Sequence, residues 1–103
     1  MTEIIEAEKS VEERLDIDLK DVLKVIARKG VSDILHSLEK SPKRFSQLMF
    51  DTKLNPSILD RHLKALIRIE LVTKEMGMYK LTETGNKVVT TIDDLLNLFK
   101  ERL

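Results

Sequence analysis

Apolar residues recur along this chain at spacings of three and four, which is the period of helices that each bury one face. Asp18 is the expected cap of one helix, which ends near Gly30, and a second helix begins at about Ser32. After the break "KSPKR", Ser46 is the expected cap of a third, short helix. The apolar stripes of these three helices are Val22, Leu23 and Ile26; Ile34, Leu35 and Leu38; and Leu48 and Met49.

The stretch "LNPSILDRHLKALIRIELV" predicts a fourth helix with two different faces. Asn55 caps it, and Pro56 takes the first helical position, where a missing N–H costs nothing. One face is apolar and contains Ile58, Leu59, Leu63, Leu66 and Ile67. The other face carries a polar row at spacings of four, three and four, made of Ser57, Arg61, Lys64 and Arg68.

The period changes after Leu71. The segment "VTKEMGMYKLT" is rich in β-branched and aromatic residues and has Gly77 near its centre, which predicts two short strands joined by a tight turn. Thr82 or Thr84 then caps a last, long helix with a broad apolar stripe. The expected fold class is mainly α with a small β-hairpin, in the order of a winged helix-turn-helix followed by a long C-terminal helix.

The charge is segregated along a chain whose formal net charge is zero. Residues 1–18 hold seven acidic residues and two basic ones, residues 19–87 hold fourteen basic and eight acidic ones, and residues 88–103 have a net charge of −1. With 103 residues the chain has room for one modest core. The expected organisation is an acidic N-terminal extension (1–18), a winged-helix domain (19–82) and a C-terminal dimerisation helix (83–103).

Three stretches resemble the winged-helix transcription regulators of the HxlR type, and more loosely those of the MarR and ArsR types. "SPKRFSQL" is similar to the family's entry into its helix-turn-helix, "NPSILDRHLKAL" to its recognition helix, and "YKLTETG" to the strand and cap after its wing. The resemblance implies a DNA-binding regulator. The chain departs from the family pattern at Val31, where a tryptophan is usual, at Glu70, where a glycine is usual, and in a shorter, less basic wing.

Several other functions lack the residues they need. The sequence has no cysteine, which excludes a disulfide framework, a thiolate metal site and a thiol-based sensor. The only histidines, His36 and His62, lack the paired spacing of a zinc site, and Asp93 and Asp94 are adjacent and expected on the solvated surface. We therefore predict no enzyme activity, no metal and no cofactor. No apolar run is long enough for a membrane, so a cytoplasmic protein is expected.

The hypothesis drawn from these patterns is a homodimeric regulator that binds double-stranded DNA in a sequence-specific manner, with residues 56–69 in the major groove. The sequence indicates no particular effector. The predicted DNA-binding residues are Lys43, Arg44, Ser57, Arg61, Lys64, Arg68, Lys74 and Lys80. The predicted dimerisation residues are Val88, Ile92, Leu95, Leu96 and Phe99. The alternative is a winged helix used as a protein-interaction module in a larger assembly, with the acidic extension and the apolar wing tip as contact surfaces.

Overall fold

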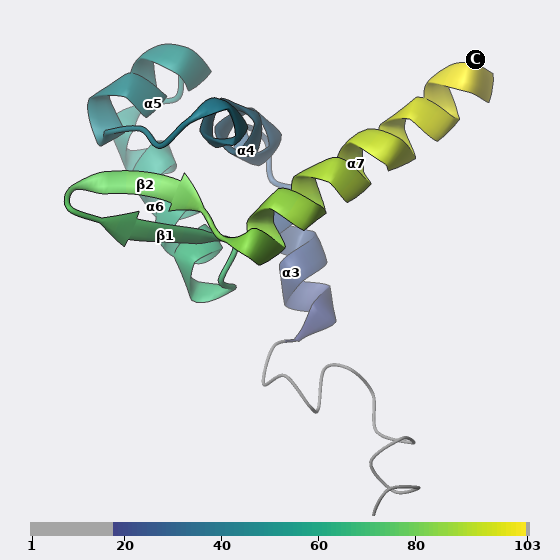
Figure 1. Ribbon diagram of the computed structural model, residues 1–103, viewed down its shortest axis with the longest axis horizontal. Helices are drawn as coiled ribbons and strands as arrows, with labels where there is room; N and C mark the ends of the chain where they lie inside the picture. Colours follow the sequence, from purple (N-terminus) through teal and green to yellow (C-terminus); the bar gives the residue numbers. More distant parts are fainter. Residues whose placement is uncertain (1–17, 103) are drawn as a thin grey trace, which may run out of the picture.

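The computed structural model describes residues 18–102, and its elements follow the predicted order (Figure 1). The spacing of Ser10 and Glu13 also predicts a short N-terminal helix, and Ile4, Val11 and Leu15 form an apolar series there; both lie outside the described residues. None of the helices within 18–102 is long and apolar enough to cross a bilayer. The elements are α3 (Leu19–Ile26), α4 (Val31–Lys40), α5 (Phe45–Thr52), α6 (Pro56–Arg68), β1 (Val72–Glu75), β2 (Met78–Leu81) and α7 (Glu83–Arg102).

Within residues 18–102, a single hydrophobic core lies between α4, α5, α6 and the hairpin, and the first turns of α7 close it. Its fully buried side chains come from six elements, so the helices are fixed relative to one another by shared packing. At about 25 cal/mol per Å² of buried apolar surface, such packing is the main source of stability in a domain of this size. The largest of these side chains are Val25, Val31, Ile34, Leu35, Leu48, Leu59, Leu63, Leu66, Val72 and Val89.

The two strands form an antiparallel hairpin in which Val72 pairs with Leu81 and Glu75 with Met78. The turn between them has Met76 at φ 52° and Gly77 at φ 79°, which are the left-handed values that a two-residue hairpin turn requires. The chain just before α5 adds one rung to this sheet, because Lys43 and Tyr79 exchange backbone hydrogen bonds of 2.9 and 2.8 Å. The hairpin is therefore attached to the entry of the helix-turn-helix.

The caps confirm three predictions and correct one. The side chain of Asp18 accepts from the N–H of Lys20, and that of Asn55 accepts from the N–H of Ile58. Ser46 is not the cap of α5, because the helix already begins at Phe45 and the side chain of Gln47 accepts from the N–H of Arg44 at 2.8 Å. The last helix is capped by Thr82, whose hydroxyl accepts from the N–H of Gly85 and donates to the carbonyl of Glu70.

The backbone conformation of Glu70 explains why a glycine is usual at this position in the family pattern. It has φ 64°, in the left-handed region that favours glycine, and it forms the turn between α6 and β1. Gly85, which the chain retains, lies where an added Cβ would be 2.1 Å from the carbonyl oxygen of Leu71. The start of α7 is thus pressed against the backbone that follows α6.

Two apolar residues predicted to face inward are exposed instead. Leu23 on α3 is 57% exposed, while Val25 on the same helix is fully buried. On α6, Ile67 is 38% exposed and His62 takes a buried position beside Leu63. In both helices the buried stripe therefore differs from the predicted one, because Val25 and His62 take buried positions that the apolar pattern did not assign.

Candidate nucleic-acid interface

Helix α6 is fixed in place by its buried face. Leu59, Leu63 and Leu66 are buried in the core, and the helix start is set by Asn55 and Pro56. His62 adds a polar anchor, since its Nε2 donates to the carbonyl oxygen of Lys29 at 3.0 Å. This bond ties the middle of α6 to the turn between α3 and α4, and it makes His62 a structural residue.

The opposite face of α6 is open to solvent and polar. Ser57, Arg61 and Lys64 are exposed along it, as the sequence predicted. Lys64 forms an ion pair of 2.9 Å with Asp60 one turn earlier, and this partner raises the pKa of Lys64. Asp60 is therefore neutralised by a cation of its own helix, which reduces its repulsion of a phosphate. Arg61 forms no ion pair with another described residue.

Arg68, the fourth member of the predicted row, is directed elsewhere. Its guanidinium donates to the carboxylate of Asp21 in the first turn of α3. The hydrogen bond lowers the pKa of Asp21 and raises that of Arg68. Arg68 thus joins α6 to α3, and the polar row brought together on the open face consists of Ser57, Arg61 and Lys64.

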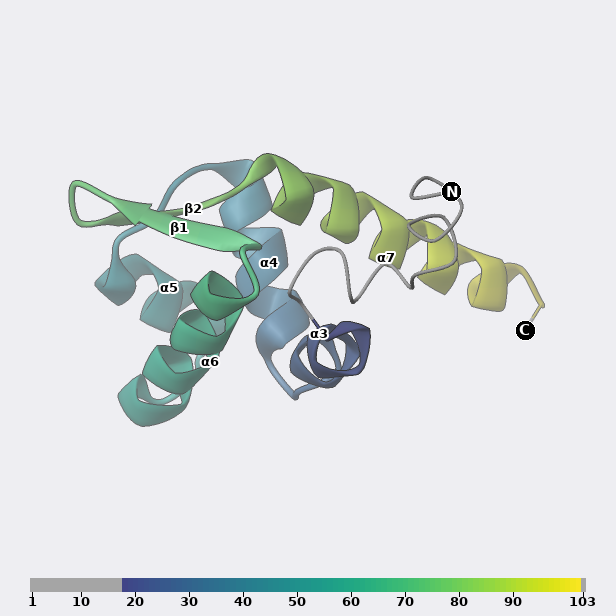
Figure 2. The same ribbon diagram turned by 90° about the horizontal axis from the view of Figure 1, so that it is seen from below.

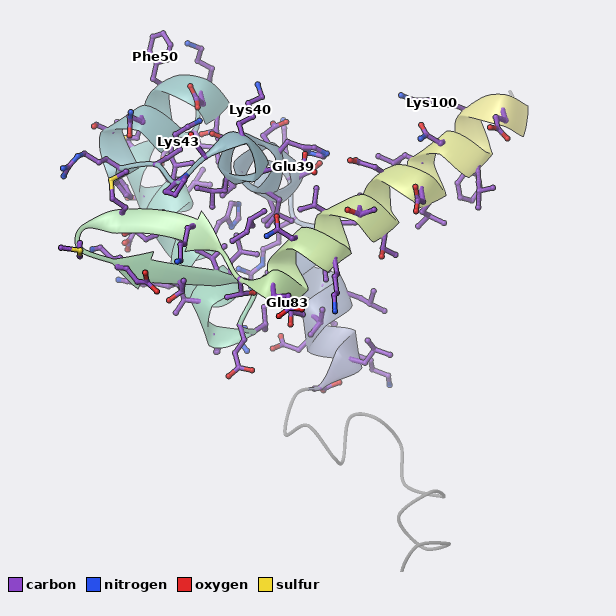
Figure 3. The ribbon with its side chains drawn as sticks, in the orientation of Figure 1. Glu39, Lys40, Lys43, Phe50, Glu83 and Lys100 are labelled. Atoms are coloured by element: carbon purple, nitrogen blue, oxygen red, sulfur yellow. The ribbon has the colours of Figure 1, made fainter. Side chains whose placement is uncertain are left out.

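Lys43 is also engaged within the domain. Its Nζ lies 2.9 Å from Asp51 and 3.2 Å from both the carbonyl and the hydroxyl oxygen of Ser37, and its side chain is 14% exposed. Ser37 in turn donates to Asp51 at 2.7 Å. This network connects the end of α4, the rung beside β2 and the end of α5, and Figure 3 shows Lys43 at this junction.

The remaining predicted cations lie around the hairpin. Lys80 is paired with Glu75 across the strands at 3.1 Å, and Lys74 lies 5.1 Å from the ring centre of Tyr79. Arg44 is exposed at the start of α5, with its guanidinium close to the hairpin turn at Gly77. Lys74 and Arg44 are cations that form no ion pair within residues 18–102.

The structure places further polar residues beside the predicted contacts, which the pattern of the sequence did not single out. Ser46 and Gln47 are exposed in the first turn of α5, next to Arg44, whereas the sequence analysis considered Ser46 only as a helix cap.

Asp93, predicted as solvated surface, forms a hydrogen bond of 2.7 Å with His36. No helical spacing could have indicated this pair, because the two residues are 57 positions apart.

The sequence and the fold have counterparts in known proteins. An uncharacterized HTH-type transcriptional regulator from Methanocaldococcus jannaschii is 31% identical over 81 residues, which are 70% of this chain and 76% of the relative. The chain belongs to the helix-turn-helix transcriptional regulators. Residues 28–74 of this chain match the family model described as "Bacterial regulatory protein, arsR family". Helix-turn-helix transcriptional regulators are DNA-binding proteins, not enzymes.

Solved structures agree with the fold of the regulator. Quinone-bound YodB from B. subtilis aligns with a TM-score of 0.74 and 21% identity, over 82% of this chain and 97% of that one. A homodimeric winged helix-turn-helix DNA-binding domain from Mycobacterium bovis aligns with a TM-score of 0.73 and 18% identity, over 94% and 95% of the two chains. At these identities the two structures support the winged helix-turn-helix fold.

Proposed function

We propose that this regulator binds a specific double-stranded DNA sequence as a homodimer, with α6 in the major groove. The observation that carries this proposal is the open face of α6, where Ser57, Arg61 and Lys64 project from a helix whose other face is packed in the core. A helix fits the major groove, and side chains in its first turns reach base edges while later cations reach phosphates. The packing of α6 in the core also supports this proposal, because it fixes the positions of these polar groups before DNA binds.

The predicted contact residues divide into two groups by their partners. In our proposal Arg44, Ser57, Arg61, Lys64 and Lys74 meet DNA, because their side chains are exposed or paired only within α6. The other three stabilise the domain, since each forms an ion pair that holds two segments together; they are Lys43, Arg68 and Lys80. Ser46 and Gln47 extend the first group at the start of α5.

The proposed dimer surface is the distal half of α7, which projects beyond the other described elements in both views (Figures 1 and 2). Leu95, Leu96 and Phe99 are each about half exposed there, and Leu98 joins them. Val88 and Ile92, also predicted for the dimer, instead pack partly against the core of their own domain. An exposed apolar surface of this kind is costly in a monomer and is covered when a second copy pairs with it.

Further support for a dimer comes from α3 and from geometry. Leu19 and Leu23 on α3 are each more than half exposed and add to the apolar surface available to a partner. A two-fold axis would set two recognition helices about 34 Å apart, one turn of DNA, so that a protomer with few cations gains a second set. The narrower resemblance to HxlR-type regulators and the cytoplasmic location stay predictions.

The test is DNA binding as a function of salt. The full-length protein is titrated against a labelled duplex from the promoter region of its own gene and against a random duplex, at several salt concentrations. We expect tighter binding to one duplex, with log K falling linearly with log salt by about 0.9 for each phosphate neutralised. Equal binding to both duplexes would contradict sequence specificity, and binding independent of salt would contradict a phosphate-contacting interface.

A protein-interaction module is the second candidate function, because the hairpin turn and α5 each expose a large apolar side chain. Met76 at the hairpin turn is 98% exposed, and Phe50 on α5 is 73% exposed and points away from the domain in Figure 3. Such residues are enriched at protein contacts. Under this reading the same titration would show no salt-dependent binding to either duplex.

A further inference from the structure

The formal charge of the chain is divided between the described domain and the segment that precedes it. Residues 18–102 hold sixteen basic and twelve acidic residues, a net charge of +4, whereas residues 1–17 hold two basic and six acidic ones, a net charge of −4. A short segment thus cancels the charge of a domain whose open face is proposed to meet phosphates. Opposite net charges on two parts of one chain attract each other, most strongly at low salt.

Residues 1–17 are attached to the domain beside the end of α6. Asp18 is the N-cap of α3, and Asp21 in the first turn of that helix accepts from Arg68 in the last turn of α6. In Figure 1 the start of α3 and the end of α6 both lie at the lower side of the domain. The point of attachment is therefore next to one end of the open face of α6.

The segment is long enough to cover this face. Helix α6 has 13 residues, which is about 20 Å at 1.5 Å per residue. Residues 1–17 can span up to about 56 Å if extended and about 25 Å if helical. In either conformation their length suffices to pass Lys64, Arg61 and Ser57 from the end at which they are attached.

The open face of α6 offers groups that the rest of the described domain leaves available. Arg61 forms no ion pair within residues 18–102, and Lys64, which is 76% exposed, is paired only with Asp60 of its own helix. Ile67 follows Lys64 by three positions on the same side of the helix and is 38% exposed, although it is apolar. A partner suited to this face has carboxylates along its length and an apolar group at the end near α3.

Residues 1–17 have this chemistry. Leu15 and Ile17 come just before α3, so they are the apolar residues nearest along the chain to the end of α6 that exposes Ile67. Acidic residues recur through the segment, at Glu3, Glu6, Glu8, Glu12, Glu13 and Asp16. Charge, reach and the position of the apolar residues thus all match this segment to the open face.

We propose that residues 1–17 of each chain lie across the open face of its own α6 when no DNA is bound, and compete with DNA for it. Their carboxylates pair with Arg61 and Lys64, where phosphates and base edges would otherwise bind. Because the segment is tethered, its effective concentration is in the millimolar range and does not depend on protein concentration. The competition with DNA rests on the proposed function, whereas the docking itself does not.

Such docking sets a threshold for DNA binding. It lowers the affinity for every duplex by the same factor, because DNA binds only the fraction of molecules in which the face is free. A non-specific duplex offers charge alone, so only a duplex that adds contacts to base edges retains a useful affinity. The competing contacts are ionic, so the factor decreases as the salt concentration rises.

Docking is measured on full-length protein without DNA. A carbodiimide joins carboxylates directly to lysine amines, and mass spectrometry identifies the joined residues. The described pairs Asp60–Lys64, at 2.9 Å, and Glu75–Lys80, at 3.1 Å, serve as internal references. We expect carboxylates of residues 1–17 to be joined to Lys64 at low salt and less often at high salt.

Two results of this experiment would overturn the proposal. One is that the carboxylates of residues 1–17 are joined to Lys87 or Lys100 in place of Lys64, since the segment would then lie along α7. The other is that no carboxylate of the segment is joined to Lys64 at low salt. In a mixture of isotope-labelled and unlabelled protein, the joined peptides should come from one chain, and joining between chains alone would also contradict docking on the segment's own α6.

The competition is measured with a variant in which Glu3, Glu6 and Glu8 are each changed to Gln. Its affinity for a random duplex should exceed that of the wild type by about tenfold at low salt, and the difference should vanish as salt rises. The matched control carries Glu83→Gln, Asp94→Asn and Glu101→Gln on α7, which change the net charge equally, and it should bind like the wild type.

Equal gains in both triple variants would mean that net charge, not docking, governs the affinity, and would overturn the competition. If the wild type and both variants bind no duplex at any salt concentration, the proposed DNA binding fails instead. Docking is then decided by the cross-links alone, because that experiment contains no DNA.

Discussion

Arg68, in the last turn of α6, donates to the carboxylate of Asp21 in the first turn of α3. The two residues are 47 positions apart, and their bond places α3 against the end of α6. Arg68 could reach a DNA phosphate only by giving up this partner. Arg68 therefore holds α6 in position, whereas Arg61 and Lys64 are presented on its open face.

Replacing either member of this pair should destabilise the fold by a shared effect. Arg68→Ala and Asp21→Ala are each expected to lower the denaturant midpoint, and the double variant should lose less than the sum of the two, because both changes break one interaction. DNA affinity should change little in Arg68→Ala. Additive losses of stability in denaturant titrations would show that the two side chains do not act together.

Arg61→Ala tests the open face directly. Arg61 has no ion pair within the described residues, so its removal should leave the denaturant midpoint close to that of the wild type. DNA binding should weaken by about 1 to 3 kcal/mol if Arg61 reads a base edge, and by less if it meets a phosphate. Fluorescence anisotropy at moderate salt measures this loss.

Lys40→Ala is the matched control for Arg61→Ala, because it removes the same charge from an exposed position at the end of α4, outside the predicted contacts (Figure 3). The control variant should bind DNA like the wild type. If both variants lose the same affinity, the effect comes from net charge, and the proposed groove face is wrong.

Local patterns were enough to predict most of the fold. Asn55 and Asp18 act on backbone groups two or three residues away, and Gly77 sits in a turn of two residues, so each prediction needed only neighbouring sequence. His62 shows where this fails, since its burial depends on a carbonyl in another segment, that of Lys29. A polar residue on an apolar face can be placed only when its partner is known.

The candidate site was predictable in outline and not in its pairings. Exposure of Ser57, Arg61 and Lys64 follows from helical spacing alone. The engagement of Lys43 with Asp51 does not, because it depends on how α4 packs on α5 and on where the chain meets β2. Residues with the same charge thus look alike in the sequence and differ in what they do.

The Asp51 network predicts a sensitivity to acid. Hydrogen bonds from Lys43, and then from Ser37, lower the pKa of Asp51 below its ordinary value of 3.8. A carboxyl whose pKa is lowered by folding stabilises the fold above its unfolded pKa, and this contribution is lost as the pH falls through the folded pKa. The wild type should therefore lose stability below about pH 4 more steeply than Asp51→Asn.

Urea titrations across that pH range measure the difference. Asp94→Asn serves as control, because its carboxylate forms no ion pair within the part of the chain that the structure describes. It should follow the wild-type pH dependence. A parallel loss of stability in the wild type and in Asp51→Asn would rule out a contribution from this network.

The last prediction concerns the dimer surface on α7. Leu95 and Phe99 lie four positions apart on one face of the distal half, are 53% and 58% exposed, and lie beyond the part of the helix that packs on its own core. Changing both to glutamate would place four carboxylates in the interface of a pair, where desolvation and repulsion oppose association. The double variant should be a monomer by light scattering, with an unchanged helical signal by circular dichroism.

A second double variant separates this effect from a general loss of apolar surface. Phe50→Glu with Met76→Glu removes two exposed apolar side chains from α5 and the hairpin turn, away from α7, and adds the same charge. This protein should keep the mass of a dimer, since neither residue belongs to the proposed surface. A Leu95→Glu, Phe99→Glu protein that remains dimeric with full helical signal would mean that α7 is not the interface, and a monomeric control would mean that the hairpin side of the domain takes part in the pairing.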